Sequence, residues 1–294
     1  MGTLSKPTYF VDYTEIALMQ PAPNRGDGAD WRAIAAFLAL AFGWSWAFWV
    51  PKALAGLSLL DGLPVLPELG AFGPSVAAVV LVAYADGITG VRRLFARAVQ
   101  VDYPTRWLAV ALLLPIGVVA AALAVAYVTG TEPSYPWAET PSVLPIAFVF
   151  IFFLGGPVQE EFGWRGYLLD PLQDRLGATV AGLSIGLVWA VWHLPLFYIP
   201  SQTIYYNVPM FGFFVSTAFL SVLHTWLYNN TNRSLLPALL MHTAFNWANG
   251  MFPVLESDPA SVTLLIALAA ATAAVVAYWG PSTLSRPRSR SDIT

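Results

Sequence analysis

Two adjacent carboxylates and an arginine stand in the stretch PVQEEFGWRG, residues 157–166, between long apolar runs. Residues four apart on a helix share a face, so Glu161 and Arg165 can form an i,i+4 ion pair with the acid on its favoured N-terminal side. Glu160 points about 100° away from Glu161 and cannot easily share that pair. The spacing therefore predicts a structural ion pair beside a carboxylate, Glu160, that is available as a general base.

The three charges are costly if the flanking segments lie in lipid. On translocon scales, one charged side chain at the centre of a transmembrane helix opposes insertion by roughly 2.5–3.5 kcal/mol. A helix end that reaches the membrane interface would hold such charges at lower cost. However, apolar sequence resumes directly at Tyr167. We therefore expect this group to have a functional role.

The chain has three histidines, and all of them fall in apolar segments of its C-terminal half. His193 lies in WAVWHLPLF, and His242 lies in LLMHTAFNW with Asn246 four residues later on the same helical face. A buried imidazole and an amide in this register can coordinate a metal, hold a water or donate hydrogen bonds to an oxyanion. His224, in SVLHTWLYNN, lacks such a partner, and we expect it to make a structural hydrogen bond.

The composition indicates the medium in which these residues work. Of the 294 residues, 57% are hydrophobic and only 11% are charged, and the mean hydropathy is +0.62. Soluble domains carry about 25% charged residues, so lipid is the expected solvent for most of this chain. The absence of cysteine excludes disulfides, thiolate metal sites and a cysteine nucleophile.

The elements that must position the polar residues are apolar segments close to the roughly 20 residues that span a bilayer. Proline and glycine mark the short connectors between them. In lipid every backbone polar group must be paired within the protein, which makes helices the expected structure. The sequence predicts an all-α polytopic membrane protein with about eight transmembrane helices. We expect these at about 31–50, 68–85, 106–129, 142–169, 178–199, 208–228, 235–254 and 260–280.

Residues 31–280 are expected to form one helical domain whose core motifs lie in 157–250. A polar tail, residues 1–30, precedes this domain and a basic tail, residues 281–294, follows it. With eight spans, thirteen of the 14 Lys and Arg residues lie on the side of both termini, and only Lys52 lies on the other. Cytoplasmic loops carry the excess of Lys and Arg, so both termini are predicted to be cytoplasmic in a multi-pass protein of the cell membrane.

In their order along the chain, the polar motifs resemble those of the CPBP (Abi) family of intramembrane proteases, which includes the type II CAAX prenyl endopeptidases. They read EEFGWR at 160–165, WAVWH at 189–193 and HTAFN at 242–246. The similarity extends from about residue 68 to residue 250. The second motif usually has Phe four residues before its histidine, and here Trp189 takes that place. We expect Trp189 to pack as a large apolar side chain.

This resemblance implies hydrolysis of a peptide bond within the membrane. Glu160 would be the general base and His193 its partner in positioning water. His242 and Asn246 would steady the tetrahedral intermediate. Glu160, His193 and His242 are also sound ligands for zinc with an open fourth position, although no HExxH signature is present. A zinc cofactor is therefore an open alternative at this stage.

The predicted function is that of an intramembrane endopeptidase acting on a membrane-associated or lipidated protein or peptide. The expected partners are that substrate and the lipid bilayer, and no nucleic acid. A catalytically silent scaffold that binds a membrane partner is the main alternative, but a scaffold has no need of an unpaired Glu160. A small-solute transporter would show paired halves with interrupted helices, which we do not find. The natural substrate, the retention of activity and the oligomeric state are left open.

Overall fold

The computed structural model describes residues 31–55, 67–131, 134–135, 137–206 and 209–286. Among these residues every regular element is helical, which confirms the all-α class. The expected N-terminal tail, residues 1–30, and residues 287–294 of the expected C-terminal tail lie outside the described residues. The helices are α2 (Trp31–Ala55), α3 (Gly73–Ala96), α4 (Arg106–Val128), α5 (Val143–Leu154), α6 (Pro157–Gly163), α7 (Leu169–Leu176), α8 (Ala178–Trp192), α9 (Thr203–Tyr206), α10 (Met210–Asn230), α11 (Leu236–Met251) and α12 (Asp258–Trp279).

Several helices begin where the sequence supplies a start signal. A proline in the first turn opens α3, α6, α11 and α12. Proline suits this position because its fixed φ matches the helix and its missing N–H would have had no helical partner there. At the start of α12 the Ser257 hydroxyl also accepts a hydrogen bond from the Ala260 N–H. This is the usual capping bond for one of the unpaired amides of a first turn.

Seven helical stretches of the described residues are long and apolar enough to cross a membrane, as a polytopic membrane protein requires. The eighth expected span, 235–254, forms α11, which has only 16 residues. That corresponds to about 24 Å of helix, less than the roughly 30 Å of the hydrocarbon core. It ends at Met251 because Phe252 takes an extended conformation before Pro253. Seven of the eight expected spans therefore correspond to helices that could cross a membrane, and α11 is shorter than a span requires.

The segment expected as one span at 142–169 is broken into short pieces. Helix α5 ends at Leu154, and Gly156 bends the chain with a φ of +115° before α6 begins. Glycine adopts this backbone conformation readily, whereas other residues rarely do. A π-helical turn, Trp164–Leu168, then separates α6 from α7, and such turns are frequent at functional sites. Glu160 and Glu161 thus lie on the short helix α6, between the bend at Gly156 and the π-helical turn that holds Arg165.

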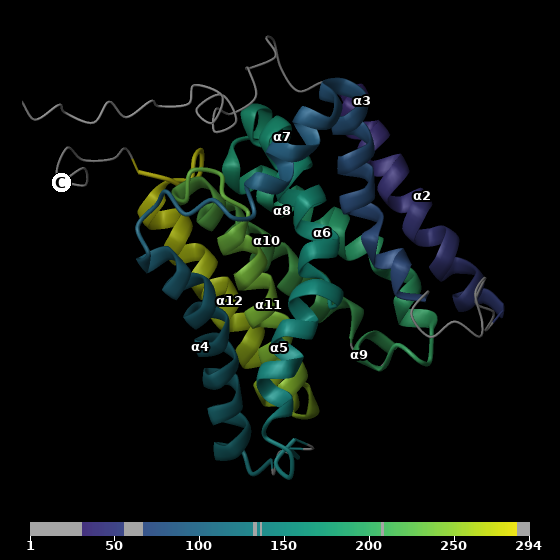
Figure 1. Ribbon diagram of the computed structural model, residues 1–294. Coiled ribbons are helices and arrows are strands. Elements are labelled where there is room, and N and C mark those ends of the chain that lie inside the picture. Colours follow the sequence, from purple (N-terminus) through teal and green to yellow (C-terminus); the bar gives the residue numbers. More distant parts are fainter. Residues whose placement is uncertain (1–30, 56–66, 132–133, 136, 207–208, 287–294) are drawn as a thin grey trace, which may run out of the picture.

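Figure 1 shows α6 in the middle of the molecule, between α5 below it and α7 above it. Helices α3 and α11 pack against α6, and α8 packs along α10. A methyl group on Gly186 of α8 would lie 2.6 Å from Ala218 Cα of α10, so the two backbones approach closely because Gly186 has no side chain. This approach brings the second motif on α8 next to α10.

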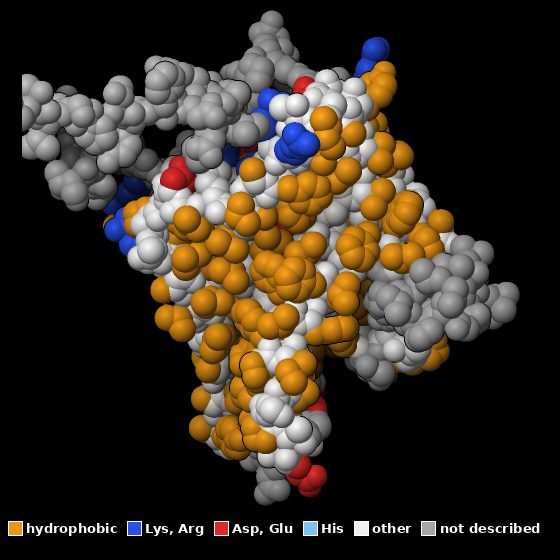
Figure 2. Space-filling view, in the orientation of Figure 1, with side chains coloured by type: hydrophobic (Ala, Val, Ile, Leu, Met, Phe, Trp, Pro, Cys, Tyr) orange, Lys and Arg blue, Asp and Glu red, His pale blue; other side chains and the backbone are white. Residues whose placement is uncertain are grey.

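Figure 2 shows apolar side chains over the sides of the molecule, where lipid would lie. In this view Lys and Arg gather at the upper end, where α12 ends and α2 begins in Figure 1, together with a few acidic side chains, whereas the charged side chains at the lower tip are acidic. Lys and Arg are therefore concentrated at one end of the molecule, as expected if that end is cytoplasmic. Cytoplasmic termini remain a prediction.

Single cysteines can test this orientation because the chain has none of its own. Thr105 and Ser282 are exposed at one end, and Ser134 and Leu255 at the other. An impermeant maleimide should label Ser134→Cys and Leu255→Cys on intact cells, and Thr105→Cys and Ser282→Cys only after permeabilisation. Labelling of Leu255→Cys and Ser282→Cys from the same side would show that α12 does not cross the membrane.

Candidate active site

Glu161 and Arg165 form an ion pair inside the protein. Glu161 Oε1 lies 3.0 Å from Arg165 Nη1, and both side chains are 0% exposed. Arg165 Nη2 also donates a hydrogen bond of 3.0 Å to Ser221 Oγ on α10. Arg165 is therefore buried in the interior. It should not be counted among the Lys and Arg residues on the side of the two termini.

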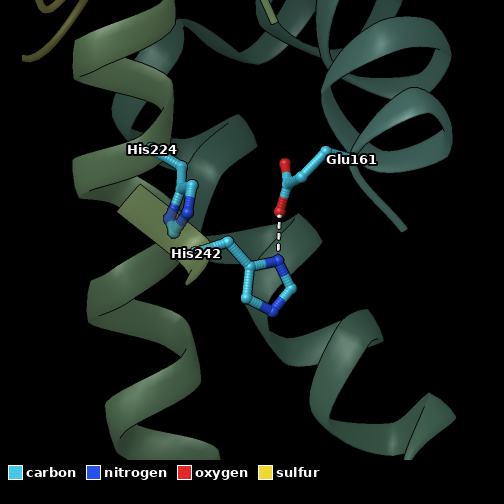
Figure 3. A group of neighbouring side chains, drawn as sticks. All are labelled: Glu161, His224 and His242. Atoms are coloured by element: carbon cyan, nitrogen blue, oxygen red, sulfur yellow. Dashed lines mark hydrogen bonds and ion pairs between the residues drawn. The ribbon is translucent and has the colours of Figure 1, made fainter. Parts of the chain in front are cut away.

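The same carboxylate oxygen binds the third-motif histidine. His242 Nδ1 on α11 lies 2.8 Å from Glu161 Oε1, as Figure 3 shows. A carboxylate can only accept, so the hydrogen resides on His242 Nδ1. In the neutral imidazole this leaves the lone pair on Nε2. Glu161 thus pairs with Arg165 and also orients His242.

The other two histidines are held through the same ring atom. His193 Nδ1 lies 2.9 Å from the Trp189 carbonyl oxygen, and His224 Nδ1 lies 2.8 Å from the Leu220 carbonyl oxygen. Since a carbonyl only accepts, each Nδ1 carries the hydrogen. In their neutral forms all three imidazoles therefore present Nε2 as a base or ligand.

Glu160 has a hydrogen-bond donor that we did not expect. Trp189 packs in the core as expected, and its indole N–H also donates to Glu160 Oε2. Indole combines a large apolar surface with one N–H that needs a partner when buried. The sequence showed the tryptophan, but it could not show that its N–H would meet Glu160.

The other oxygen of Glu160 lies beside the Gly155–Gly156 bend. A methyl group placed on Gly156 would lie 2.8 Å from Glu160 Oε1, 3.2 Å from His242 Nε2 and 3.3 Å from Asn246 Nδ2. One face of Gly156 is therefore surrounded by a carboxylate oxygen, an imidazole nitrogen and an amide nitrogen. Three of the four residues expected to be catalytic converge there.

Hydrogen bonds hold this bend in place. Asn246 Nδ2 donates to the Gly155 carbonyl oxygen at 3.0 Å, and the Gly156 N–H donates to Gln159 Oε1 at 2.8 Å. The amide of Asn246 has two hydrogens, so one is left for another acceptor. The bend and the residues around it thus form one connected unit.

His193, the fourth expected residue, lies farther from Gly156. No hydrogen bond of the described residues joins it directly to Glu160, and Trp189 contacts both.

The exposed fractions of the candidate catalytic side chains differ slightly from those of the ion pair. Glu160 and His193 are 4% exposed and His242 is 2% exposed, whereas Glu161 and Arg165 are 0% exposed. All five side chains are buried, and those of the ion pair are completely so.

His224, for which we expected only a structural role, lies next to the ion pair. One ligand atom from each of Glu161, His224 and His242 lies within 4.8 Å of the others, as Figure 3 shows. His224 Nε2 and Glu161 Oε2 are buried without a hydrogen-bond partner. The sequence could not reveal this cluster, because it depends on how α6, α10 and α11 meet.

Glu161, His224 and His242 have the ligand types that zinc accepts, but their surroundings oppose a cation. Glu161 Oε1 already binds Arg165, and His242 Nδ1 carries a hydrogen. A divalent ion would lie near the guanidinium, and like charges repel strongly in a poorly polarisable interior. These three residues therefore fit an ion-pair network better than a resident metal.

The metal ligands suggested by the sequence form a different set. Of Glu160, His193 and His242, the structure brings Glu160 and His242 to the same face of Gly156. Among the described residues, Glu161, His224 and His242 form the group of potential ligands that converges. Zinc binding by Glu160, His193 and His242 stays a prediction.

Comparisons with known proteins agree with the position of the site. The family model for type II CAAX prenyl endopeptidase Rce1-like proteins matches residues 142–248. The CAAX prenyl protease 2 of Methanococcus maripaludis is 27% identical over 143 residues, which cover 46% of this chain and 50% of that relative. The similarity thus spans about half the length of the relative. The family match includes all three polar motifs.

The buried ion pair leads to a prediction about stability. Arg165→Ala should lower the free energy of unfolding by roughly 3–5 kcal/mol, because it leaves Glu161 as an unpaired charge in the interior. Unfolding of the purified protein in detergent measures this loss. Arg93→Ala is the matched control, since Arg93 and Asp86 form a partly exposed pair at 3.6 Å, and such pairs contribute about 0–1 kcal/mol. Equal stability of the two variants would contradict the assignment.

Proposed function

We propose that the chain is an intramembrane endopeptidase, because residues 142–248 match the family model for type II CAAX prenyl endopeptidase Rce1-like proteins. Its substrate would be a membrane-associated or lipidated protein or peptide, in keeping with the name of its methanococcal relative. The observation that supports this most directly is the convergence of Glu160 Oε1, His242 Nε2 and Asn246 Nδ2 on one face of Gly156. A base, a second acceptor and a donor are what water-dependent hydrolysis needs.

In the proposed reaction a water binds between these three atoms. It donates one hydrogen to Glu160 Oε1 and the other to His242 Nε2, and it accepts a hydrogen bond from Asn246. A buried water usually has two to four polar partners, so this number is sufficient. His193 was expected to share the water, but no hydrogen bond of the described residues joins it to Glu160, and its Nδ1 pairs with the Trp189 carbonyl oxygen. We assign its Nε2 lone pair to an N–H of the substrate backbone instead.

The peptide bond is then hydrolysed in two steps. Glu160 removes a proton from the water while the oxygen bonds to the scissile carbonyl carbon, and the carbonyl electrons move onto its oxygen. As the oxyanion forms, the free N–H of Asn246 moves its hydrogen bond from the water oxygen to the oxyanion. When the carbon–nitrogen bond breaks, the oxyanion electrons restore the carbonyl and Glu160 returns its proton to the leaving amine. The base is regenerated, and no metal is needed at any step.

The first experiment measures cleavage by the full chain in nanodiscs, using two quenched peptides of one sequence, with and without a farnesyl group. The wild-type chain should cleave at least the lipidated peptide. Glu160→Gln keeps the shape of the side chain but removes the base, so kcat should fall about 10²–10⁴-fold. Glu139→Gln, in an exposed loop, is the control and should retain wild-type turnover.

The same experiment separates the alternatives. A folded Glu160→Gln protein that keeps its full effect in cells would favour the membrane scaffold over the enzyme. A strong chelator should leave cleavage unchanged, because the proposed steps use only Glu160, His242 and Asn246 and need no metal. Reversible inactivation that zinc restores would overturn the metal-free mechanism.

The face of Gly156 provides a second test. Gly156→Ala would place a methyl group among Glu160 Oε1, His242 Nε2 and Asn246 Nδ2. We expect kcat to fall by about 10²-fold or more, since small displacements of reacting groups can have effects of that size. Gly130→Ala is the matched control, because Gly130 also has a positive φ, +84°, but nothing lies within 4 Å of its added methyl group. Equal turnover of the two variants would disprove this placement of the water.

A further inference from the structure

Trp189 lies at the centre of the candidate site and is only 4% exposed. The guanidinium carbon of Arg165 lies 4.9 Å from the centroid of its ring. The ring of His242 approaches it edge-on at a centroid distance of 5.1 Å, and that of His193 lies at 6.0 Å. One indole thus contacts the ion pair and both histidines of the proposed reaction.

The indole is also bonded to the proposed base. Its N–H donates to Glu160 Oε2. An indole N–H can only donate and a carboxylate can only accept, so each supplies what the other needs. Burying either group without a partner would be unfavourable. The bond occupies Oε2, while Oε1 faces Gly156. The two oxygens of Glu160 therefore have different surroundings.

The position of the ring is itself restricted. Arg165, which is held by Glu161 and Ser221, lies over the ring of Trp189, and a cation in this place is attracted to the π face. The main-chain carbonyl of Trp189 accepts from His193 Nδ1. A phenylalanine would fill much of the same space, but it has no hydrogen to give to Glu160. The donor is the feature that distinguishes tryptophan here.

We propose that Trp189 is a positioning residue for the reaction, because its N–H holds the Glu160 carboxylate with Oε1 directed toward Gly156. Without this bond the carboxylate would rotate about its terminal torsion and meet the water in several orientations. The effect on catalysis rests on the proposed function of Glu160 as the base. The hydrogen bond itself does not depend on that function and can be tested alone.

The hydrogen bond is tested by the indole resonances of the full chain labelled with ¹⁵N-tryptophan in nanodiscs. The chain has 12 tryptophans, and the Trp189 signal is the one lost in Trp189→Phe. In Glu160→Ala the Trp189 indole proton loses its carboxylate acceptor, so its resonance should move upfield. The Trp192 signal is the internal control, since that indole donates to Ser45 Oγ at 2.8 Å and should stay in place.

The positioning role is tested by kinetics with the cleaved peptide. Trp189→Phe should lower kcat by about tenfold or more and leave KM within about threefold, because it alters the alignment of the base rather than substrate binding. Trp192→Phe is the matched control. It removes another buried indole hydrogen bond from the same helix, and its kcat should stay within about twofold of the wild type. A general loss of packing would affect both variants.

Three results would decide the proposal. An unmoved Trp189 resonance in Glu160→Ala would overturn it, whether or not the protein cleaves a peptide. A moved resonance with wild-type kcat in Trp189→Phe would also overturn it, because the bond would then exist without positioning the base. If the wild-type protein cleaves no peptide, the proposed function fails, and a moved resonance would still establish that Trp189 holds Glu160.

Discussion

A charged pair buried in a membrane protein, Glu161 with Arg165, is the interaction on which the site depends. Removing two charges from water costs several kcal/mol for each ion, and their attraction compensates only if further hydrogen bonds satisfy them. The structure provides such bonds from two other helices, through Ser221 on α10 and His242 on α11. The pair can therefore be buried only where α6, α10 and α11 meet.

The requirement to partner buried polar groups also connects the pair to the proposed base. Arg165 lies over the ring of Trp189, Trp189 donates to Glu160, and His242 binds Glu161 while its other nitrogen faces the same glycine as Glu160. In a medium of low polarity such linked contacts are stronger than in water, and an unpaired member is more costly. The ion pair thus contributes to the geometry of the site without facing it.

Irregular backbone makes this arrangement accessible. A continuous helix through residues 143–176 would have no bend beside Glu160. The turn at Gly156 instead exposes backbone groups, and side chains of the site bind them: Gln159 accepts from the Gly156 N–H, and Asn246 donates to the Gly155 carbonyl. Irregular backbone within a membrane protein is tolerated where the protein itself satisfies it. The residues that stabilise the bend are thus next to those that would use it.

The sequence by itself determined the features that depend on short spacings and on composition. The apolar segments predicted a polytopic helical protein, and the spacing of four predicted that Glu161 and Arg165 share a helical face, because helix geometry relates near neighbours. It did not determine which side chains from distant segments would meet. His242 reaches Glu161 across 81 residues, and the Trp189 indole reaches Glu160 across 29. The short α11 and the bend before α6 were also absent from our expectations. Only the packing of helices decided these contacts, because helical periodicity does not relate residues that are far apart in the sequence.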